Sequence, residues 1–324
     1  MTGGADWRPT ATLDTLRRRA ECLAATREFF RARNVLEVET PALVNAPVSD
    51  VNLGNVRVDI PDHPRPLWLH TSPEYAMKRL LAAGSGDIYQ VCRVFRGAER
   101  GRQHNPEFTM VEWYRLGFSL DDLMNEVAAL VRALLGARGA GLRVEFISYE
   151  QALHQHAGLD PFGDLRPLRA AARALGFEAA LADTVARDEL LDLIVGARVG
   201  PALGEESLTF MHRYPSSQAA LARLDPVDPR VALRFELYHR GIELANGYHE
   251  LTSGAEQRAR FDRDLDHRAA RGLPTAAVDP RLLAALEAGL PDCAGVALGF
   301  DRVLMLATGA ATIDEVLAFP VERA

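Results

Sequence analysis

The spacing of apolar and polar positions predicts alternating helices and strands from the start of the chain. Between Leu13 and Arg33, apolar residues recur at helical spacing among arginines, which predicts an amphipathic helix that stops at Asn34. The segment VLEVETPAL predicts a short strand that ends at Pro41. Residues 51–69 alternate between turn signals and predict further strands, and Glu74 to Ala83 predicts a second helix.

A hairpin with a long polar loop follows. Ile88 to Phe95 and Phe108 to Arg115 both have strand character, and the segment between them is charged and contains glycine. Ser119 is placed to cap a helix that runs to Gly136, because acidic residues follow it in the first turn.

The second half of the chain predicts a helical block followed by more strands. Residues 152–204 are rich in alanine and leucine and predict several helices. The strands predicted after this block are Leu208 to His212, Val231 to Tyr238 and Gly241 to Leu251. The helices predicted after them are Leu282 to Ala288 and Asp301 to Thr308. Adjacent strands with helices inserted between them predict an α+β fold on an antiparallel sheet.

Composition narrows the possible classes of protein. The 324 residues are 48% hydrophobic and 25% charged, which is typical of a globular protein. The net charge of −7 argues against tight nucleic-acid binding, which usually needs a basic surplus. No apolar run is long enough for a membrane span and no secretory signal is visible, so we expect a cytoplasmic protein without membrane or stable nucleic-acid partners.

Lysine and cysteine are rare in this chain. Lys78 is the single lysine among 37 basic residues, and we attribute this skew to the base composition of the source genome. The three cysteines are far apart and form no CxxC pair, so neither a disulfide framework nor a structural zinc site is expected.

The hairpin loop concentrates positive charge and is a candidate phosphate site. Guanidinium groups suit phosphate oxygens, although a solvated charged turn is the alternative. The cationic side chains of this region are Arg93, Arg96, Arg100, Arg102 and His104.

A second candidate site is acidic. In RFELYHRGIELANGYHEL, a turn at residues 239–241 would let Glu236 and Glu243 face one another. We expect these carboxylates to have no cation from their own segment, so a divalent metal or a cationic ligand would relieve their repulsion. The solvated face of an antiparallel sheet is the alternative.

A third candidate is Arg302, just inside a predicted helix that follows glycines, where anions are favoured. In this order, the arginine loop, the acidic segment and the glycine-plus-arginine segment resemble the catalytic core of class II aminoacyl-tRNA synthetases, specifically the lysyl-tRNA synthetase branch. The matching segments are FFRARNVLEVETPAL, VCRVFRGAERGRQHNPEFTMVEWYR, RFELYHRGIELANGYHEL and GVALGFDRVLML.

The resemblance implies a site for ATP. Arg96 would hold the α-phosphate and the substrate carboxylate, and Arg302 would hold the γ-phosphate; these two are the expected catalytic residues. Phe108 would stack on adenine. The other nucleotide-binding residues expected from the resemblance are Glu99, His104, Asn105, Glu243, Leu244 and Gly299. Glu236 and Glu243 would hold Mg²⁺.

The resemblance also implies a site for a lysine-type amino acid. Glu74, with Ser72 and Pro73 before it, would meet the substrate amino group. The side-chain ammonium would be surrounded by acceptors, since burying an unpaired ammonium is costly. The residues expected around it are Glu112, Tyr114, Asn246, Glu250 and Ala297.

Two positions depart from the family patterns. The second signature commonly has glutamate two residues after its arginine, where this chain has Ala98 followed by Glu99. The middle glycine of the third lysyl-tRNA synthetase signature is Ala297 here, and a single methyl group changes discrimination by about 1–3 kcal/mol. Ala297 therefore favours a shifted amino group, as in (R)-β-lysine, over α-lysine.

The segment before the first helix is too short for the anticodon-binding domain of a lysyl-tRNA synthetase, so we expect residues 1–324 to form a single catalytic domain. This stand-alone form resembles the elongation factor P lysyltransferases, which activate lysine or β-lysine with ATP and acylate a lysine side chain of elongation factor P. A truncated enzyme that charges tRNA and a non-catalytic synthetase-like protein are the alternatives. By resemblance, the first signature implies a homodimer.

Overall fold

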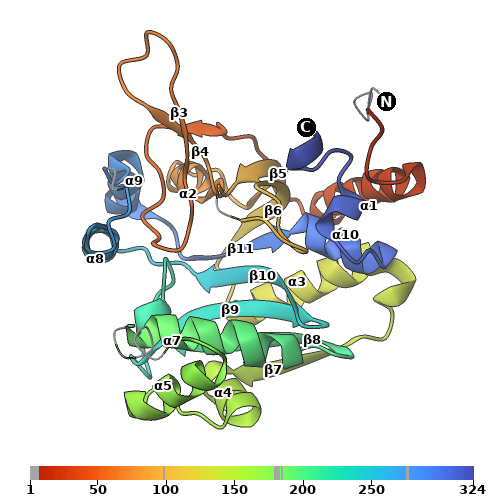
Figure 1. The fold of residues 1–324 in the computed structure, drawn as a ribbon. Coiled ribbons are helices and arrows are strands. Elements are labelled where there is room, and N and C mark those ends of the chain that lie inside the picture. The colour runs from red at the N-terminus through yellow and green to blue at the C-terminus, as the bar shows by residue number, and fades with distance from the viewer. Residues whose placement is uncertain (1–6, 98, 179–182, 184, 275–276) are drawn as a thin grey trace, which may run out of the picture.

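A computed structural model describes residues 7–97, 99–178, 183, 185–274 and 277–324. Its centre is a sheet of eight strands in the order β1-β5-β6-β11-β10-β9-β8-β7 (Figure 1). The strands are β1 (Leu36–Glu37), β5 (Ile88–Phe95), β6 (Glu107–Leu116), β7 (Arg143–Ser148), β8 (Ser207–Pro215), β9 (Val231–His239), β10 (Ile242–His249) and β11 (Cys293–Gly299). The six strands from β5 to β8 in this order pair antiparallel, and the two outermost pairs, β1 with β5 and β7 with β8, are parallel.

A second, small sheet lies beside the large one. Its three strands are β2 (Leu43–Val44), β3 (Val56–Val58) and β4 (Leu67–Leu69). The loop between β3 and β4 projects from the top of the molecule in Figure 1, above α2. This sheet accounts for the strand pattern that the sequence predicts over residues 51–69.

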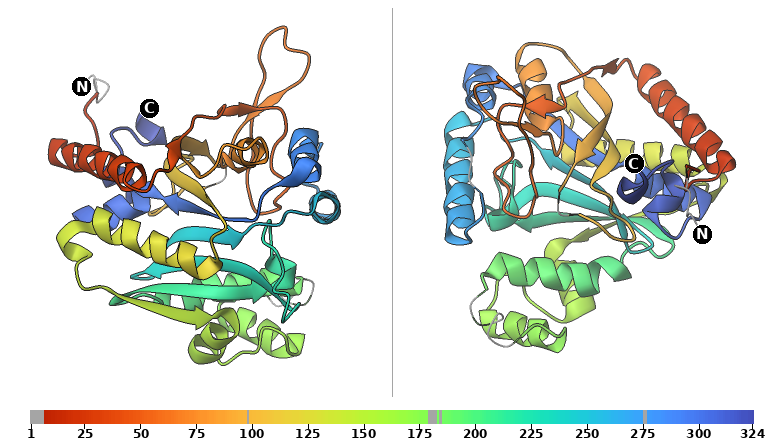
Figure 2. Two further views of the ribbon diagram at one scale, coloured as in Figure 1. Left: turned by 180° about the vertical axis from the view of Figure 1, so that it is seen from behind. Right: turned by 45° about the horizontal axis from the view of Figure 1, so that its top comes forward.

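One face of the large sheet is covered by helices from both ends of the chain. The helices are α1 (Leu13–Arg31), α3 (Leu120–Leu135) and α10 (Phe300–Thr308). Figure 2 shows α3 lying across the back of the sheet, and its buried side chains pack with Val111, Trp113 and Val296 in the main core. Ser119 caps α3 in a capping box with Asp122, as the sequence predicts.

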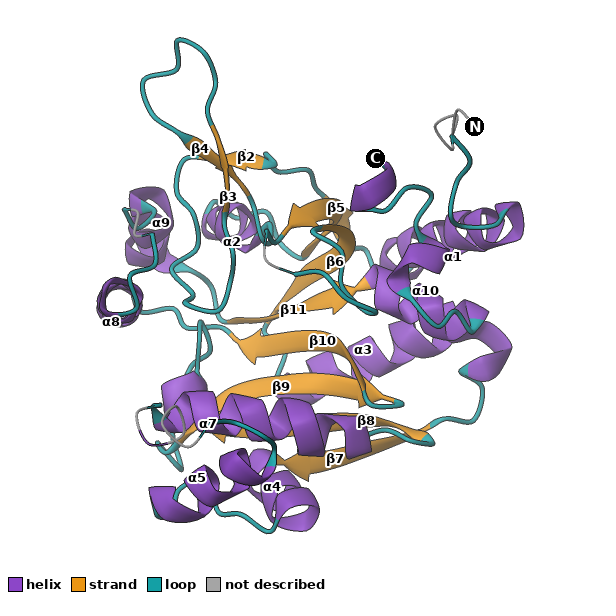
Figure 3. Cartoon of the chain, in the orientation of Figure 1, coloured by secondary structure: helices purple, strands orange, loops and turns teal. Residues whose placement is uncertain are grey.

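The opposite face is covered only toward its two ends. Beneath β8 and β9, Tyr214 and Tyr238 pack against the helical block α4 (Tyr149–Ala157), α5 (Leu165–Ala174) and α7 (Arg187–Ile194). At the other end, Ile88 and Tyr114 pack with α2 (Glu74–Ala82), α8 (Gly254–Ala270) and α9 (Pro280–Gly289). Figure 3 shows the central strands passing between these two groups of helices.

The α+β class is confirmed, but two expectations were wrong. The sheet is mixed and not wholly antiparallel, because a short strand and an exposed strand add in parallel at its two edges. The strand predicted to end at Pro41 is limited to the two residues of β1, and Asn34 before it has a φ of 55° that ends the helical geometry.

The structure adds elements that the pattern did not reveal. β7, β11 and α8 were not predicted: β7 is largely exposed, β11 is made mostly of glycine and alanine, and α8 is strongly polar. None of the helices among the described residues is both long and apolar enough to cross a membrane.

Candidate active site

Strand pairing places four of the predicted site residues in one row across the sheet. Asn246 pairs with Glu236 on one side and Ala297 on the other, and Ala297 pairs in turn with Glu112. Because side chains alternate along a strand, this row lies on the face opposite α3, whose apolar contacts are the intervening residues such as Val111 and Val296. We call the face that carries the row the site face.

Three carboxylates converge near the Glu112 end of the row, and we call Glu74, Glu112 and Glu250 the carboxylate cluster. The Glu112 carboxylate accepts hydrogen bonds from Ser72 Oγ at 2.7 Å and from the Tyr114 hydroxyl at 2.8 Å. Lys78 Nζ lies 2.6 Å from a carboxylate oxygen of Glu74 and 2.6 Å from one of Glu250. Pro73 immediately precedes α2, where Glu74 is the first helical residue, and the Ser72 hydroxyl accepts from the Glu74 amide at 3.0 Å.

Burial opposes ionisation of two carboxylates of this cluster, Glu112 and Glu250. Removal from water, with Glu74 nearby, raises the pKa of Glu112 to about 8. Burial likewise raises the pKa of Glu250 to about 7, although the Lys78 ammonium opposes the shift. An ammonium ligand would restore the ionised forms, because an opposite charge at close range favours the charged carboxylate.

Gly295 on β11 provides the space that the cluster occupies. A Cβ atom at this position would lie 2.6 Å from a Glu250 carboxylate oxygen and would overlap the Tyr114 ring. This glycine is the first residue of the segment GVALGF, whose sequence alone predicts no role for it. Any side chain here would displace two of the residues expected around the substrate ammonium.

Arg96 begins the loop of the β5–β6 hairpin, as predicted. Its guanidinium carbon lies 5.2 Å from the centre of the Phe108 ring, and its Nη1 is 3.5 Å from a Glu99 carboxylate oxygen. Its buried Nε has no hydrogen-bond partner among the described residues. A ligand oxygen would satisfy such a donor, so Arg96 has the geometry of an anion-binding residue.

Arg302 lies in the first turn of α10 and links the hairpin loop to β10. It donates to the carbonyls of Glu243 at 2.8 Å and Gln103 at 3.3 Å, and its Nη2 lies 2.6 Å from His104 Nε2. Burial and the Arg302 charge lower the pKa of His104, so the neutral imidazole is favoured as the partner of this guanidinium.

The start of α10 is fixed by buried polar contacts. Asp301 accepts from the Thr109 amide at 2.6 Å and from Arg19 at 2.5 Å, which joins α10 to β6 and α1. Gly299, which precedes the helix, lies near the Leu244 carbonyl: an added Cβ would be 3.7 Å from it. These contacts hold the first turn of α10, and with it Arg302, in place.

Glu236 and Glu243 share the site face but do not pair directly. A bulge at Leu244 sets Glu243 opposite Tyr238, two residues beyond Glu236. Burial and the Glu236 charge raise the pKa of Glu243. The two carboxylates thus repel one another, which fits a shared divalent cation, and Mg²⁺ is commonly held by one or two carboxylates with substrate phosphates.

One expectation about this pair was wrong. Arg234, from the same strand as Glu236, lies 2.6 Å from a Glu236 carboxylate oxygen, and the Tyr238 hydroxyl donates to the other at 2.6 Å. Glu236 therefore has a cation from its own segment, which the sequence reasoning did not recognise. Across residues 7–97, 99–178, 183, 185–274 and 277–324, no group of three or more acidic, histidine or cysteine side chains is arranged to hold a metal.

Comparison with known proteins identifies the family of the chain. The family model of the class II tRNA synthetases (D, K and N) matches residues 4–323. An elongation factor P–(R)-β-lysine ligase of Klebsiella pneumoniae (strain 342) is 51% identical, and one of Salmonella dublin is 50% identical; both matches cover the whole of each chain. The chain belongs to the elongation factor P–(R)-β-lysine ligase branch of the class II tRNA synthetases.

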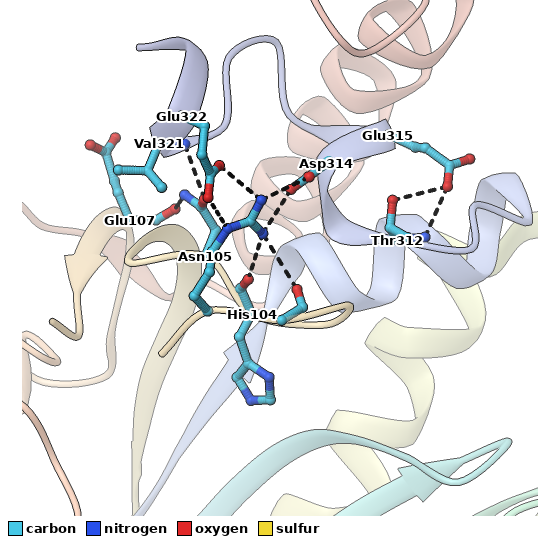
Figure 4. A network of polar contacts seen from close by, with 10 residues as sticks. His104, Asn105, Glu107, Thr312, Asp314, Glu315, Val321 and Glu322 are labelled. Carbon is cyan, nitrogen blue, oxygen red and sulfur yellow. Dashed lines mark hydrogen bonds and ion pairs between the residues drawn. The ribbon is translucent and has the colours of Figure 1, made fainter. Parts of the chain in front are cut away.

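Within this synthetase-like core, the arginines predicted as one cationic cluster have separate partners. Arg100 lies 2.9 Å from Asp314 and 2.5 Å from Glu322, and it also donates to the His104 carbonyl at 3.3 Å. Figure 4 shows how these acids from the C-terminal segment gather beside the loop. Arg93 lies 3.5 Å from Glu107. These contacts hold the loop in place, and among the described arginines of the loop Arg96 has a buried donor without a hydrogen-bond partner.

Asn105 is tied to the same C-terminal segment. Its amide nitrogen donates to the Glu107 carbonyl at 2.7 Å, and its amide oxygen accepts from the Val321 amide at 3.2 Å (Figure 4). Both ends of this buried side chain are occupied, so its expected contact with the nucleotide stays a prediction. Ala98, the departure from the second synthetase signature, lies outside the described residues.

Three further residues on or beside the site face were missed by sequence reasoning: Gln90, Lys78 and Arg234. Gln90 pairs with Glu112, and its side-chain oxygen is buried with no partner among the described residues. The sequence offers one signal for Lys78, its status as the single lysine, but base composition explains this signal equally well.

Proposed function

We propose that this chain is an ATP-dependent ligase that activates lysine or (R)-β-lysine and transfers it to a lysine side chain of elongation factor P. The observation that carries this function is the buried carboxylate cluster on the sheet face that also bears Glu236 and Asn246, with Arg96 and Arg302 at the adjoining hairpin loop and helix start. A diamino acid needs acceptors for its ammonium groups and cations for its carboxylate and for the phosphates of ATP. The named activity of the full-length relatives supports elongation factor P as the acceptor.

The first chemical step is attack of the amino-acid carboxylate oxygen on the α-phosphorus of ATP. This forms the acyl-adenylate and breaks the bond to pyrophosphate. Arg96 would neutralise the carboxylate and the α-phosphate as they approach, and Arg302 would hold the terminal phosphate. Mg²⁺, held by Glu236 and Glu243, would supply further charge neutralisation at the phosphate oxygens.

The second step is attack of the acceptor lysine amine on the adenylate carbonyl. An amide bond forms, the bond to AMP breaks, and the amine loses a proton. The activated amino acid remains bound through its ammonium groups, with the amino group at Glu74 and the side-chain ammonium at Glu112 and Glu250.

ATP–pyrophosphate exchange followed by an acceptor assay tests this function. We expect exchange with α-lysine or (R)-β-lysine, and acylation of elongation factor P after it is added. Absence of exchange with both isomers would overturn the ligase function. Acylation of tRNA in place of the factor would favour the alternative enzyme that charges tRNA.

Arg302→Ala is expected to abolish exchange while the protein stays folded. The substitution removes the proposed phosphate contact, which acts in the transition state, so a loss of at least about 10²-fold is expected. Thermal unfolding checks the fold, and Arg132→Ala on α3, away from the site face, is the matched control. Exchange at a normal rate in Arg302→Ala would refute its phosphate role.

The homodimer, the cytoplasmic location and Mg²⁺ as the metal are further parts of this proposal. A translation factor as acceptor supports the cytoplasm. The exposed apolar side chains of Leu13 and Leu36, both near the first signature, support an interface there.

A further inference from the structure

Lys78 is an unusual residue in both sequence and structure. Of 37 basic residues, 36 are arginines, and the one lysine lies in α2 directly behind the carboxylate cluster. Its side chain is 1% exposed, as is that of Glu250. Lysine is almost never buried this deeply unless it is paired.

The pairing of Lys78 bridges two elements. Glu74 lies one helical turn before it on α2, and Glu250 follows β10, yet a carboxylate oxygen of each lies 2.6 Å from the same Nζ atom. A single ammonium thus fixes the separation of two carboxylates that are expected to contact opposite ends of the substrate. The compact ammonium fits between them, whereas the planar fork of an arginine is larger and demands a different geometry.

The charges of this region can be counted. When Glu74, Glu112 and Glu250 are all ionised, Lys78 cancels one of their three charges and leaves two. Lysine and β-lysine each carry two ammonium groups, while their carboxylate would be held by Arg96. The empty site would hold protons instead, which agrees with the raised pKa of Glu112 and Glu250.

We propose that Lys78 is a positioning and specificity-determining residue, an internal counter-ion that bridges Glu74 to Glu250 and sets the remaining charge of the carboxylate cluster to match a diamino acid. This inference rests on the proposed function, because it assumes that the cluster binds the substrate ammonium groups. Lys78 does not touch the reacting atoms, and it acts through the two carboxylates.

The test is the pH dependence of the KM for the amino acid in pyrophosphate exchange. Loss of the ammonium in Lys78→Met removes the cation that opposes the raised pKa of Glu250, so Glu250 holds a proton at neutral pH and binds the substrate poorly. We expect the amino-acid KM at pH 7 to rise several-fold, by up to about tenfold for each unit of pKa gained, and to fall as the pH is raised. The KM for ATP is expected to change little.

Two variants separate the charge of Lys78 from its bulk. Lys78→Arg retains the charge in a larger side chain, so its KM is raised but the shape of its pH profile stays that of the parent. Arg79→Met removes the neighbouring exposed cation of α2 and is expected to behave as the parent throughout. The titratable and charged side chains that face Lys78 are Glu74 on α2, Glu250 after β10 and Cys293 on β11. Glu112, Tyr114 and Tyr248 face Glu74 and Glu250 from the strands β6 and β10.

Glu112→Gln distinguishes failure of this inference from failure of the proposed function. A raised amino-acid KM in Glu112→Gln together with an unchanged KM and pH profile in Lys78→Met would overturn the counter-ion role alone. An unchanged amino-acid KM in both variants would overturn the substrate site and the role of Lys78 with it.

A folding test covers the case in which Lys78→Met is not obtained as folded protein. The double variant Lys78→Met with Glu250→Gln removes the cation together with one carboxylate. If Lys78 is the counter-ion, the double variant has a higher melting temperature than Lys78→Met alone. A double variant that is as unstable as the single one would show that Lys78 acts through packing, and would overturn the proposal.

Discussion

At the scale of single residues, burial decides which side chains of the site carry charge. Glu112 has two hydrogen-bond donors, Ser72 and Tyr114, yet burial and the nearby Glu74 raise its pKa to about 8 from an ordinary value of 4.5. The donors lower the pKa and the burial raises it, and the burial dominates. Glu112 therefore binds a proton in the empty site at neutral pH.

From the raised pKa of Glu112 we predict how the free energy of unfolding depends on pH. A carboxyl group whose pKa is higher in the folded than in the unfolded state stabilises the fold below about pH 4.5, and this contribution is lost as the pH rises to about 8. We expect Glu112→Gln to flatten the decline in unfolding free energy over this range, measured by urea denaturation at several pH values. Glu150→Gln, an exposed change on α4, is the control. An equally steep decline in Glu112→Gln would contradict the raised pKa of Glu112.

A second prediction at the scale of single residues concerns Gly295. In Gly295→Ala the new methyl group overlaps the Tyr114 ring and lies 2.6 Å from Glu250, so both side chains must move. Overpacking of this kind costs about 1–3 kcal/mol, and we expect a raised amino-acid KM with a smaller change in the KM for ATP. Gly196→Ala, where an added Cβ meets nothing within 4 Å, should leave both constants unchanged. An unaltered amino-acid KM in Gly295→Ala would show that the site tolerates the displacement.

At the scale of elements, the hairpin loop is held from outside by the C-terminal segment. Arg100 reaches Asp314 and Glu322, and Asn105 accepts from the Val321 amide, so residues more than 200 positions apart in sequence share one network. The loop also carries His104 and begins at Arg96. The order of this part of the site therefore depends on the last residues of the chain.

We expect Arg100→Ala to loosen the loop and to raise the KM for ATP several-fold. Because these ion pairs are partly exposed, the loss of unfolding free energy should stay below about 1 kcal/mol. The amino-acid KM should be retained, since the carboxylate cluster lies on other elements. Arg166→Ala removes an exposed arginine–aspartate pair at α5 and is the matched control. Equal changes in the two KM values would mean that Arg100 supports the fold in general and not the loop.

The elements that could be predicted from sequence are those whose own residues specify them. The hairpin strand Ile88–Phe95 and the capped helix α3 were predicted closely, because alternation and the Ser119 cap are local signals. β11 was not predicted, because its glycines and alanines leave space for neighbouring side chains and give no periodic pattern of their own. Its pairing with β6 and β10 depends on strands that are distant in sequence.

For the site, too, local signals could be predicted from the sequence, whereas contacts between distant segments could not. Resemblance named Glu74 and Glu250, but the cation between them comes from the fold, because α2 must pack against the end of β10 before Lys78 can reach both. Arg234 was missed for a related reason. The sequence does not show that alternate residues of one strand, Arg234 and Glu236, bond to each other rather than to solvent.

At the scale of the whole molecule, the sheet ends in a very short edge strand. β1 has two residues, it is terminal in the sheet, and Leu36 on it is 55% exposed. An exposed apolar side chain on an unpaired strand edge is suited to contact with a second copy of the chain.

Leu36→Glu is therefore expected to shift the protein from dimer to monomer, measured by analytical ultracentrifugation over a range of concentrations. Val227→Glu, at a site that is 90% exposed and distant in sequence from the first signature, is the control and should remain dimeric. If the parent protein is itself monomeric at micromolar concentration, the homodimer is wrong.

The solitary lysine has one more consequence. An enzyme that makes an acyl-adenylate generates an electrophile that acylates amines without discrimination whenever it escapes. This chain offers such a reagent no lysine on its own surface, because Lys78 is 1% exposed and bonded to two carboxylates. The ligase is therefore protected against acylating its own lysine side chains, and amine-directed labels applied to the folded protein should report almost exclusively on its α-amino terminus.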